Sequence, residues 1–450
     1  MSLAELPLQH PLVVGLGITA QAMCRVLVAA GRPVVVVDDH PSADARRAAE
    51  LLTVQLIDAP SPAQLDELVA AATAVLPSPG VPDHHPVFEA ARAHRVPVLD
   101  ELDLAGALDD RPLLAITGTD GKTTVTTLVT EMLRASGVPA EAAGNTDVPL
   151  VTAVADPEPR VFVVEASSFR LAHAAAFRPT VATWLNFAPD HLDNHGSLEA
   201  YEAAKARIWA DLAPDGTAVA NGDDPVVMRH VVPSATTRTF SLSDPHADYR
   251  VVDGSLVGPM GELVRVDELP RRLPHDLANA LAAAATAIAG GATVAGVRAV
   301  LTRFQGLPHR VQTLGVADGV VWVDDSKATV PHATVAAATG FASVVLVAGG
   351  RNKGLDLRQL ADAAPHVRAV VAIGDAAPEV AAAFAGLRPV TVATSMAEAV
   401  EQARAASRPG DAVLLSPGCA SFDWYRSYAE RGDDFAACVR RAVPDLEAGS

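Results

Sequence analysis

Short runs of apolar residues recur along the chain, and each is followed by a longer segment of mixed polarity. Residues 113–117 (LLAIT), 161–164 (VFVV) and 344–348 (VVLVA) are such runs, and β-branched residues are frequent in them. Strands that are buried on both faces of a parallel sheet have this continuous apolar character. The longer segments suit helices that connect one parallel strand to the next. The pattern therefore predicts an α/β fold built on parallel sheets.

The pattern divides into three consecutive units. A mixed polar segment at 101–112 follows the first unit, and residues 306–311 (GLPHRV) combine Gly and Pro with His and Arg, as in a hinge. A length of 450 residues agrees with about three domains. We expect a Rossmann-like unit at 1–110, a P-loop ATPase-like unit at 111–305 and a second Rossmann-like unit at 306–450.

Composition narrows the classes of function. The formal net charge of −18 argues against a nucleic-acid-binding protein, because such proteins neutralise phosphates with Lys and Arg. The longest apolar stretch, 277–297, is rich in alanine and broken by Gly290 and Gly291, so it suits a packed helix better than a membrane span. The start of the chain lacks a secretory pattern, and the three cysteines have no metal-ligand spacing. We expect a cytoplasmic monomer that binds neither nucleic acid nor membrane.

Residues 113–128, LLAITGTDGKTTVTTL, have the order of a phosphate-binding loop: an apolar strand, a glycine turn, a lysine and a helix that opens on hydroxyl residues. In such a loop, backbone N–H groups and the helix dipole face a phosphate chain, while the lysine reaches the outer phosphates and a hydroxyl holds Mg²⁺. The general pattern fails at one position, where Ile116 replaces the first glycine. The stretch predicts an ATP site, and a tight turn with a surface lysine is the alternative.

Residues 12–39 predict a second anion-binding turn. Gly15, Gly17 and Ala20 in GLGITA match the glycine pattern of dinucleotide-binding folds. Asp38 follows about 20 residues later, where such folds place the acid that binds a ribose. A nicotinamide or flavin enzyme is one interpretation. The turn recognises a diphosphate next to a sugar, so a nucleotide-diphosphate sugar is the other.

Polar residues also follow other predicted strands, at the end where open α/β sheets bind ligands. Ser78 and Gly80 lie in a turn after the apolar run 74–77, and a plain Pro-Gly turn explains them equally well. Glu165 ends a buried strand and is placed to bind Mg²⁺ directly or through water. Ser167 is either part of this site or the N-cap of a helix.

The densest polar cluster occupies 186–195 (NFAPDHLDNH) and precedes a helix that carries Lys205. Such density at a strand end is more typical of a site than of a solvated loop. In the third unit, polar residues gather after strand ends at 324–329, 349–354 and 416–428. Three such turns on one edge of a sheet predict a cleft, to which Arg310, Lys327 and Lys353 would bring positive charge.

Together these motifs resemble the Mur ligase family, which joins amino acids to the nucleotide-linked cell-wall precursor. The resemblance covers essentially the whole chain, through GLGITA, SPG, GTDGKTT, GNTDVPL, EASSF, DHLDNHGS with YEAAKARIW, PHRV, DDSKAT and SPGCASFD. It implies UDP-N-acetylmuramoyl-L-alanine, D-glutamate and ATP as substrates, an acyl-phosphate intermediate, and a place in cytoplasmic peptidoglycan precursor synthesis. Asp120, Arg170 and Asp276 depart from the family pattern, which commonly has Asn, Gln and Asn at these positions.

The resemblance also implies roles for the residues at matching positions. Catalytic roles fall to Lys122, Glu165, His191 and Lys205. Two Mg²⁺ ions would be held by Thr123, Glu165, His191 and Lys205, the last as a carbamate. The nucleotide would be bound by Gly118, Thr119, Asp120, Gly121, Lys122, Thr123, Thr124, Asn279, Arg310, Asp325 and Lys327. The other substrates would be bound by Thr19, Asp38, Ser78, Gly80, Asn145, Ser167, Thr329, Lys353, Ser421, Phe422 and Tyr428.

Two other functions stay open at the level of the sequence. One is a different carboxylate-amine ligase of the same family, such as a folylpolyglutamate synthase, but the GLGITA unit would then lack a purpose. The other is a dinucleotide-binding oxidoreductase or sensor whose loop at 113–128 binds only a regulatory nucleotide. Products formed from ATP and a panel of acceptors distinguish these three functions.

Overall fold

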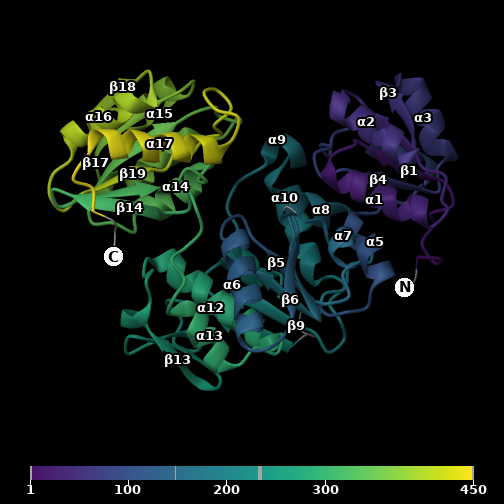
Figure 1. Ribbon diagram of the computed structural model, residues 1–450, viewed down its shortest axis with the longest axis horizontal. Coiled ribbons are helices and arrows are strands. Elements are labelled where there is room, and N and C mark those ends of the chain that lie inside the picture. Colours follow the sequence, from purple (N-terminus) through teal and green to yellow (C-terminus); the bar gives the residue numbers. More distant parts are fainter. Residues whose placement is uncertain (1–2, 147, 232–235, 448–450) are drawn as a thin grey trace. The chain divides into compact units, whose positions relative to one another are not determined.

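The computed structural model describes residues 3–146, 148–231 and 236–447 (Figure 1). The chain forms two compact units, of which the first comprises residues 1–187, 191–272 and 277–304 and the second 188–190, 273–276 and 305–450. Among the described residues, the first unit contains two parallel sheets and a small antiparallel one, and the second contains a six-stranded sheet that is parallel except at one edge. The boundaries predicted at 110/111 and 305/306 stay predictions.

The first sheet has four parallel strands in the order β3-β2-β1-β4. These are β1 (Pro11–Val14), β2 (Val35–Asp38), β3 (Gln55–Asp58) and β4 (Ala74–Pro77). Helices α1 (Ile18–Ala29), α2 (Ala43–Leu52) and α5 (Glu101–Leu108) pack on one face, and α3 (Pro62–Ala71) and α4 (Pro86–His94) on the other. Because β1 and β4 are neighbours, the turns that follow them meet at the same edge.

The segment 101–112, predicted as a polar connection, instead begins with helix α5. Asp100 accepts a hydrogen bond from the backbone of the first turn, and Asp103 bonds back to the N–H of Asp100, which completes a capping box. Their side chains are buried and hold the start of the helix.

The second sheet has six parallel strands in the order β10-β9-β8-β5-β7-β6. Their bounds are β5 (Leu113–Thr117), β6 (Ala140–Gly144), β7 (Val161–Glu165), β8 (Val181–Trp184), β9 (Thr217–Asn221) and β10 (Thr236–Phe240). On one face lie α6 (Lys122–Ala135), α12 (Pro274–Ala289) and α13 (Val294–Leu301). On the other lie α7 (Leu150–Ala153), α8 (Ser168–His173) and the 3₁₀ turn η1 (Arg207–Trp209).

The connections after β8 and β9 form the short helices α9 (Leu192–His195), α10 (Leu198–Ala206) and α11 (Pro225–Arg229). The alanine-rich stretch at 277–297 forms α12 and the start of α13, as predicted, and residues 280–287 are buried. Within the described ranges, no helix is both long and apolar enough to cross a membrane.

A small antiparallel sheet was not predicted. It consists of β11 (Arg250–Val252), β12 (Ser255–Gly258) and β13 (Gly261–Arg265), followed by the 3₁₀ turn η2 (Val266–Glu268). The dipeptide Asp253-Gly254 joins β11 to β12 with positive φ at both residues, which is the signature of a tight hairpin turn. This local signal was present in the sequence.

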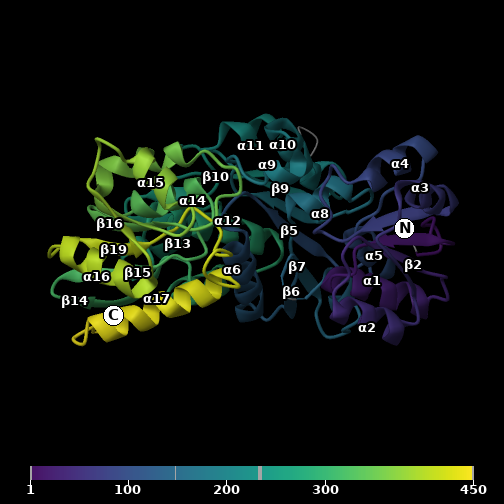
Figure 2. The ribbon, with the colours of Figure 1, turned by 90° about the horizontal axis from the view of Figure 1, so that it is seen from above.

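The sheet of the second unit has the order β14-β15-β19-β16-β17-β18. Its strands are β14 (Gln312–Ala317), β15 (Val320–Asp324), β16 (Val344–Gly349), β17 (Val367–Ile373), β18 (Val390–Ala393) and β19 (Ala412–Leu415). Helices α14 (Pro331–Ala338), η3 (Leu357–His366) and α15 (Ala377–Ala383) cover one face. Helices α16 (Met396–Ala406) and α17 (Tyr428–Ala442) lie side by side on the other (Figure 2).

The sequence predicted the central strands β15, β16 and β19 through the polar turns that follow them, and the two edge strands were missed. β14 pairs with β15 in an antiparallel hairpin, and β18 is the outermost parallel strand. Both edge strands have exposed positions, so they lack the continuous apolar runs that marked the others.

Candidate functional site

The phosphate-type loop leaves β5 at the centre of the second sheet, between β7 and β8. The ends of these three strands therefore bring Gly118, Glu165 and Asn186 to one edge of the sheet. The side-chain oxygen of Asn186 accepts hydrogen bonds from the backbone N–H groups of Thr119 and Asp120, both at 2.9 Å. The neighbouring strand thus fixes the conformation of the loop.

Two glycines allow the loop to pack closely against Leu185 and Asn279. A Cβ on Gly118 would lie 2.9 Å from the Cβ of Leu185. Gly121 has φ +85°, and a Cβ there would lie 2.6 Å from the side-chain oxygen of Asn279. Gly121 is also the N-cap of α6, and it has no side chain to cap the first turn. A helix start of this kind suits an anion.

Two lysine side chains meet at the loop. Lys122 Nζ donates to the backbone carbonyls of Gly118 and Thr119, both at 2.9 Å. Lys205 Nζ, from α10, donates to the same Gly118 carbonyl at 2.6 Å and lies 4.5 Å from the centre of the Tyr201 ring. Lys205 is 1% exposed, so its side chain belongs to the interior of the site and not to the surface of a helix.

Glu165 provides a buried carboxylate next to this loop. It is 3% exposed, and its Oε1 accepts a hydrogen bond from Asn145 Nδ2 at 3.1 Å. Its Oε2 has no hydrogen-bond partner among the described residues, which is unusual for a buried oxygen. A buried acceptor of this kind fits a hard divalent cation such as Mg²⁺.

The other predicted metal ligands lie on neighbouring elements. Thr123 is in the first turn of α6. His191 is the N-cap of α9 with φ +54°. Its ring and that of Phe169 form an edge-type contact, with their centroids 4.7 Å apart. Within the part of the chain that the structure describes, no three His, Cys, Asp or Glu side chains form a metal-ligating group. A cation next to Glu165 would therefore need hydroxyl, water or phosphate oxygens as further ligands.

The turn of GLGITA packs against the turn after β4. Gly15 has φ +75°, and a Cβ there would lie 3.2 Å from the Cβ of Ser78. Asp38 Oδ2, at the end of β2, accepts a hydrogen bond from the backbone N–H of Leu16 at 2.9 Å. The structure thus brings three of the predicted substrate-binding segments together at the point where the strand order reverses. Gly80, in contrast, is exposed, with open space around it.

A buried arginine connects the first and second sheets. Arg170 Nη1 donates to Glu101 Oε1 at 2.6 Å, and Nη2 lies 3.1 Å from Thr19 Oγ1 and 3.2 Å from the Gly144 carbonyl. The two charged side chains are 3% and 0% exposed. Glu101 also accepts from the backbone N–H groups that begin α7. The sequence singled out Arg170 only as a departure from the family pattern and gave no sign of its partner.

Ser167 caps helix α8. Its side chain accepts a hydrogen bond from the backbone N–H of Arg170 at 3.4 Å. This was the structural alternative raised by the sequence. The role of Ser167 toward a substrate stays a prediction.

A chain of polar contacts that the sequence did not predict also joins the first and second sheets. His195 Nδ1 lies 2.7 Å from Asp83 Oδ2, and its Nε2 lies 2.9 Å from Ser168 Oγ. His173 Nε2 lies 3.1 Å from the other oxygen of Asp83. Burial alone would raise the pKa of Asp83, but the hydrogen bonds from His173 and His195 outweigh burial and lower the pKa. The ionised carboxylate therefore holds both rings in place.

The candidate residues of the second unit follow strand ends of its sheet. Asp325 lies just beyond β15, where its oxygens accept from Ser416 Oγ at 2.7 Å and from the Val311 N–H at 3.1 Å. Burial raises the pKa of Asp325 to about 7. Lys327 Nζ lies 4.0 Å from the centre of the Tyr428 ring.

The remaining residues predicted in this unit differ widely in exposure. Ser421 is buried, and Phe422 is 59% exposed. Lys353 is exposed, whereas Arg310 and Thr329 are half-buried. The roles of these residues toward a ligand stay predictions.

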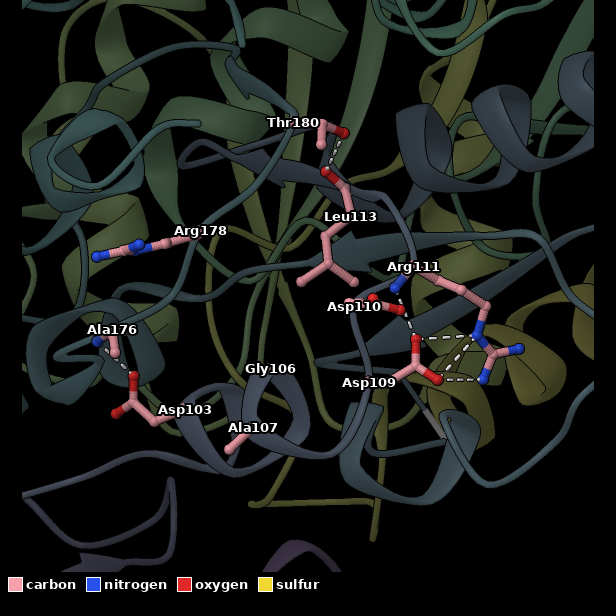
Figure 3. A pocket seen from close by; sticks show the side chains of 10 residues that line it. All are labelled: Asp103, Gly106, Ala107, Asp109, Asp110, Arg111, Leu113, Ala176, Arg178 and Thr180. Carbon is pink, nitrogen blue, oxygen red and sulfur yellow. Dashed lines mark hydrogen bonds and ion pairs between the residues drawn. The ribbon is translucent and has the colours of Figure 1, made fainter. Parts of the chain in front are cut away.

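A cavity of about 200 Å³ lies elsewhere in the first unit (Figure 3). Its lining includes the charged residues Asp103, Asp109, Arg111 and Arg178. Leu113 and Thr180 also line it, at the ends where β5 and β8 begin. This is the opposite edge of the sheet from the loop. The Arg111 guanidinium donates hydrogen bonds to Asp109 and to three backbone carbonyls, so its positive charge is neutralised within the protein. The cavity is therefore separate from the candidate site.

Three family models match consecutive parts of the chain. Residues 9–100 match the Mur ligase MurD-like N-terminal domain, 116–287 the Mur ligase middle domain and 309–419 the Mur ligase glutamate ligase domain. A Frankia casuarinae protein named UDP-N-acetylmuramoylalanine–D-glutamate ligase is 43% identical, with 98% of this chain and 95% of that protein covered. A protein of the same name from Shouchella clausii is 40% identical, with 98% of both chains covered.

Solved structures agree with the fold. The chain is similar to MurF from Acinetobacter baumannii, with a TM-score of 0.59 and 20% identity, covering 96% of this chain and 94% of that one. It is also similar to UDP-N-acetylmuramate-alanine ligase MurC from Thermotoga maritima, with a TM-score of 0.57 and 18% identity, covering 96% and 99%. At this identity the likeness shows the architecture alone, and it confirms the predicted arrangement of three consecutive α/β domains.

Proposed function

Because the chain belongs to the Mur ligase family, we propose that it is an ATP-dependent ligase that joins D-glutamate to UDP-N-acetylmuramoyl-L-alanine. The observation that carries this proposal is the match over 98% of the chain to relatives of that name, at 43% and 40% identity. The loop at Gly118–Gly121 supports it, because a ligase of this kind needs a site for a triphosphate. The product would enter cytoplasmic peptidoglycan precursor synthesis.

The reaction needs activation of a carboxylate. A free carboxylate does not accept an amine, because its leaving group would be oxide. Transfer of the γ-phosphoryl group of ATP to a carboxylate oxygen of the L-alanyl group gives an acyl phosphate and ADP. The amine of D-glutamate then attacks the acyl carbon, the C–O bond to phosphate breaks, and the nitrogen loses a proton. The protein contributes mostly positioning and charge neutralisation.

Residues at the loop have the chemistry for the first step. The Lys122 ammonium would neutralise the outer phosphates, and the first turn of α6 would donate N–H groups to them. Thr123 and the unpartnered Oε2 of Glu165 would hold Mg²⁺. That ion would neutralise charge on the transferred phosphoryl group. Gly118, Thr119, Asp120, Gly121, Thr124 and Asn279 complete the set that we assign to the nucleotide.

A second Mg²⁺ is proposed at His191 and Lys205. A carbamate forms when an unprotonated amine attacks carbon dioxide and loses a proton, which turns the lysine into an anionic oxygen ligand. The burial of Lys205, which is 1% exposed next to the loop, supports such a role because it places the side chain inside the site. Arg310, Asp325 and Lys327 are also assigned to the nucleotide.

The two remaining substrates are assigned to separate sets of residues. The UDP-sugar would lie at the turn of GLGITA and be bound by Thr19, Asp38, Ser78 and Gly80, and Asn145 would lie near the sugar. Ser167 is assigned to the substrate as well. D-Glutamate would be bound by Thr329, Lys353, Ser421, Phe422 and Tyr428, with Lys353 facing one of its carboxylates.

The test uses purified protein with ATP, Mg²⁺ and UDP-N-acetylmuramoyl-L-alanine. Addition of D-glutamate should release ADP and phosphate in equal amounts and give a product heavier by one glutamyl residue in mass spectrometry. L-Glutamate, L-lysine, diaminopimelate and a folate acceptor serve as controls. Release of ADP that depends on folate, or no release with any acceptor, would overturn the assignment. We further expect a monomer, which size-exclusion chromatography with light scattering would measure.

A further inference from the structure

We propose that Arg431 is a positioning residue that sets the geometry of the acidic-amino-acid site by joining the three turns around it. This inference rests on the proposed function, because it names what organises the D-glutamate side of that site. Arg431 lies in the first turn of α17, three residues after Tyr428, and the sequence assigned no role to it. It does not touch the substrate and acts through the turns.

The contacts of Arg431 reach two of the predicted turns directly. Its Nε donates to Ser326 Oγ at 2.9 Å and its Nη2 to the Ser326 carbonyl at 2.8 Å. Its Nη1 donates to the Cys419 carbonyl at 3.1 Å. Ser326 lies between Asp325 and Lys327, and Cys419 lies two residues before Ser421. The guanidinium thus ties the turn after β15 to the turn after β19.

The third turn meets the same guanidinium. A Cβ on Gly350 would lie 3.1 Å from Arg431 Nη1 and 2.3 Å from the Ala420 carbonyl, so only glycine fits there. The next residue, Arg351, exchanges two backbone hydrogen bonds with Ala420, at 2.8 and 3.0 Å. Lys353 and Ser421, both assigned to D-glutamate, flank this bridge. Arg431 therefore lies beneath the point where the two turns pair.

Ser326 extends the connection to the aromatic side of the site. Its hydroxyl accepts from Arg431 and donates to the Tyr428 carbonyl at 2.7 Å. Lys327 Nζ in turn lies over the ring of Tyr428, 4.0 Å from its centre. Through one hydroxyl, Arg431 fixes both residues of this cation–π pair. A change at Arg431 would therefore move Lys327 and Tyr428 relative to each other.

Gly432 allows α17 to come close enough for these contacts. A Cβ there would lie 2.2 Å from His309 Nδ1 and 2.7 Å from Asp324 Oδ2. His309 Nδ1 and Asp324 Oδ2 themselves lie 2.7 Å apart. The dipeptide Arg431-Gly432 thus supplies both the fork that binds the turns and the space that lets the helix approach.

Burial of the Arg431 guanidinium costs free energy, because its charge loses contact with water. The residue is 1% exposed, and it forms no ion pair with any acid of the described residues. Its pKa is lowered to about 10 by burial, so it remains charged at neutral pH. Burying a charge costs free energy unless hydrogen bonds compensate for the lost hydration. A rigid, planar fork that satisfies three acceptors on two segments is the property that lysine or an apolar side chain lacks.

The test compares Arg431→Lys with Arg368→Lys in the full-length enzyme. Arg368 is the matched control because it bonds Asp411 in the same unit, where β17 and β19 begin, at the opposite edge of the sheet. We expect Arg431→Lys to raise the KM for D-glutamate at least tenfold and to leave the Kd for UDP-N-acetylmuramoyl-L-alanine within twofold. Arg368→Lys should leave both within twofold, even if both variants lower Tm.

A second variant, Ser326→Ala, tests the same inference in case Arg431→Lys does not fold. Ser326→Ala removes the acceptor for Arg431 Nε and the donor to Tyr428, so it should also raise the KM for D-glutamate, by about threefold or more. An unchanged KM in Arg431→Lys and Ser326→Ala would overturn the inference, as would an equal rise in Arg368→Lys. Absence of D-glutamate-dependent ADP release in the unaltered enzyme would instead overturn the proposed function, and it is measured first.

Discussion

The pair formed by Arg170 and Glu101 gives the sharpest test of what joins the first two sheets. Glu101→Gln keeps the shape of the side chain and removes its charge. The change leaves a guanidinium that is 3% exposed without its carboxylate, 2.6 Å away in the structure. It also weakens the acceptor for the N–H groups of Leu150 and Val151.

The expected cost follows from burial. Removing one partner of a buried ion pair typically costs about 3–5 kcal/mol, because the remaining charge is left without compensation. Asp100 moderates this cost. Burial raises its pKa to about 8, and the charge of Glu101 adds to that rise. Loss of the Glu101 charge makes Asp100 easier to ionise beside Arg170. We therefore expect a loss of about 3 kcal/mol at pH 7, at the lower end of the range.

The assay must report the first unit alone, because unfolding of a two-unit chain is not a single transition. Trp184 and Trp209 are buried in the first unit, and Trp322 and Trp424 belong to the second. In a Trp322→Phe, Trp424→Phe background, tryptophan emission during urea unfolding follows the first unit. Glu101→Gln, Arg170→Gln and the double variant are compared in that background. Asp58→Asn, which breaks the half-exposed pair with Arg46, is the control and should cost about 0–1 kcal/mol.

The double variant decides whether the two charges depend on each other. With both charges gone, neither is left buried alone, so the double variant should lose about 2 kcal/mol less than the sum of the single variants. Strict additivity of the two losses would refute the reasoning. So would a loss in Glu101→Gln no larger than that of Asp58→Asn.

Three further predictions concern the site. Lys122→Met should lower D-glutamate-dependent ADP release by about 10³-fold or more while the circular dichroism spectrum is retained, because a charge-neutralising contact to the transferred phosphoryl group is lost; turnover near that of the unaltered enzyme would contradict the role of the loop. If Lys205 carries the proposed carbamate, Lys205→Ala should be inactive and partly rescued by acetate or another short carboxylic acid, whose oxygens would take the place of the carbamate. Full activity without the acid would argue against a carbamate. Burial raises the pKa of Asp325 from an ordinary value of 3.8 to about 7 in the folded state. Between these two values the folded protein binds more protons than the unfolded one. The folded state therefore loses stability as the pH rises through this window. Asp325→Asn should flatten the dependence of Tm on pH between 4 and 8, and an unchanged slope would show that another group is responsible.

Local patterns in the sequence were sufficient for the main elements and for the loop. Buried parallel strands are continuous apolar runs, so β5, β7, β16 and β19 were recognisable, and glycine turns mark places where backbone must approach an anion. Edge strands such as β18 were missed because exposure breaks that continuity. The hairpin at Asp253-Gly254 had a local signal that was overlooked.

Tertiary structure alone decided which polar side chains meet. Lys205 reaches a carbonyl 87 residues earlier, and Arg170 contacts Thr19 across 151 residues. Ser326 meets Arg431 across 105. No periodicity relates residues so far apart, because their distance depends on strand order and helix packing and not on the chain between them. The sequence thus determined the kinds of group at each strand end, and the order of the strands in the sheets determined which of those groups could act together.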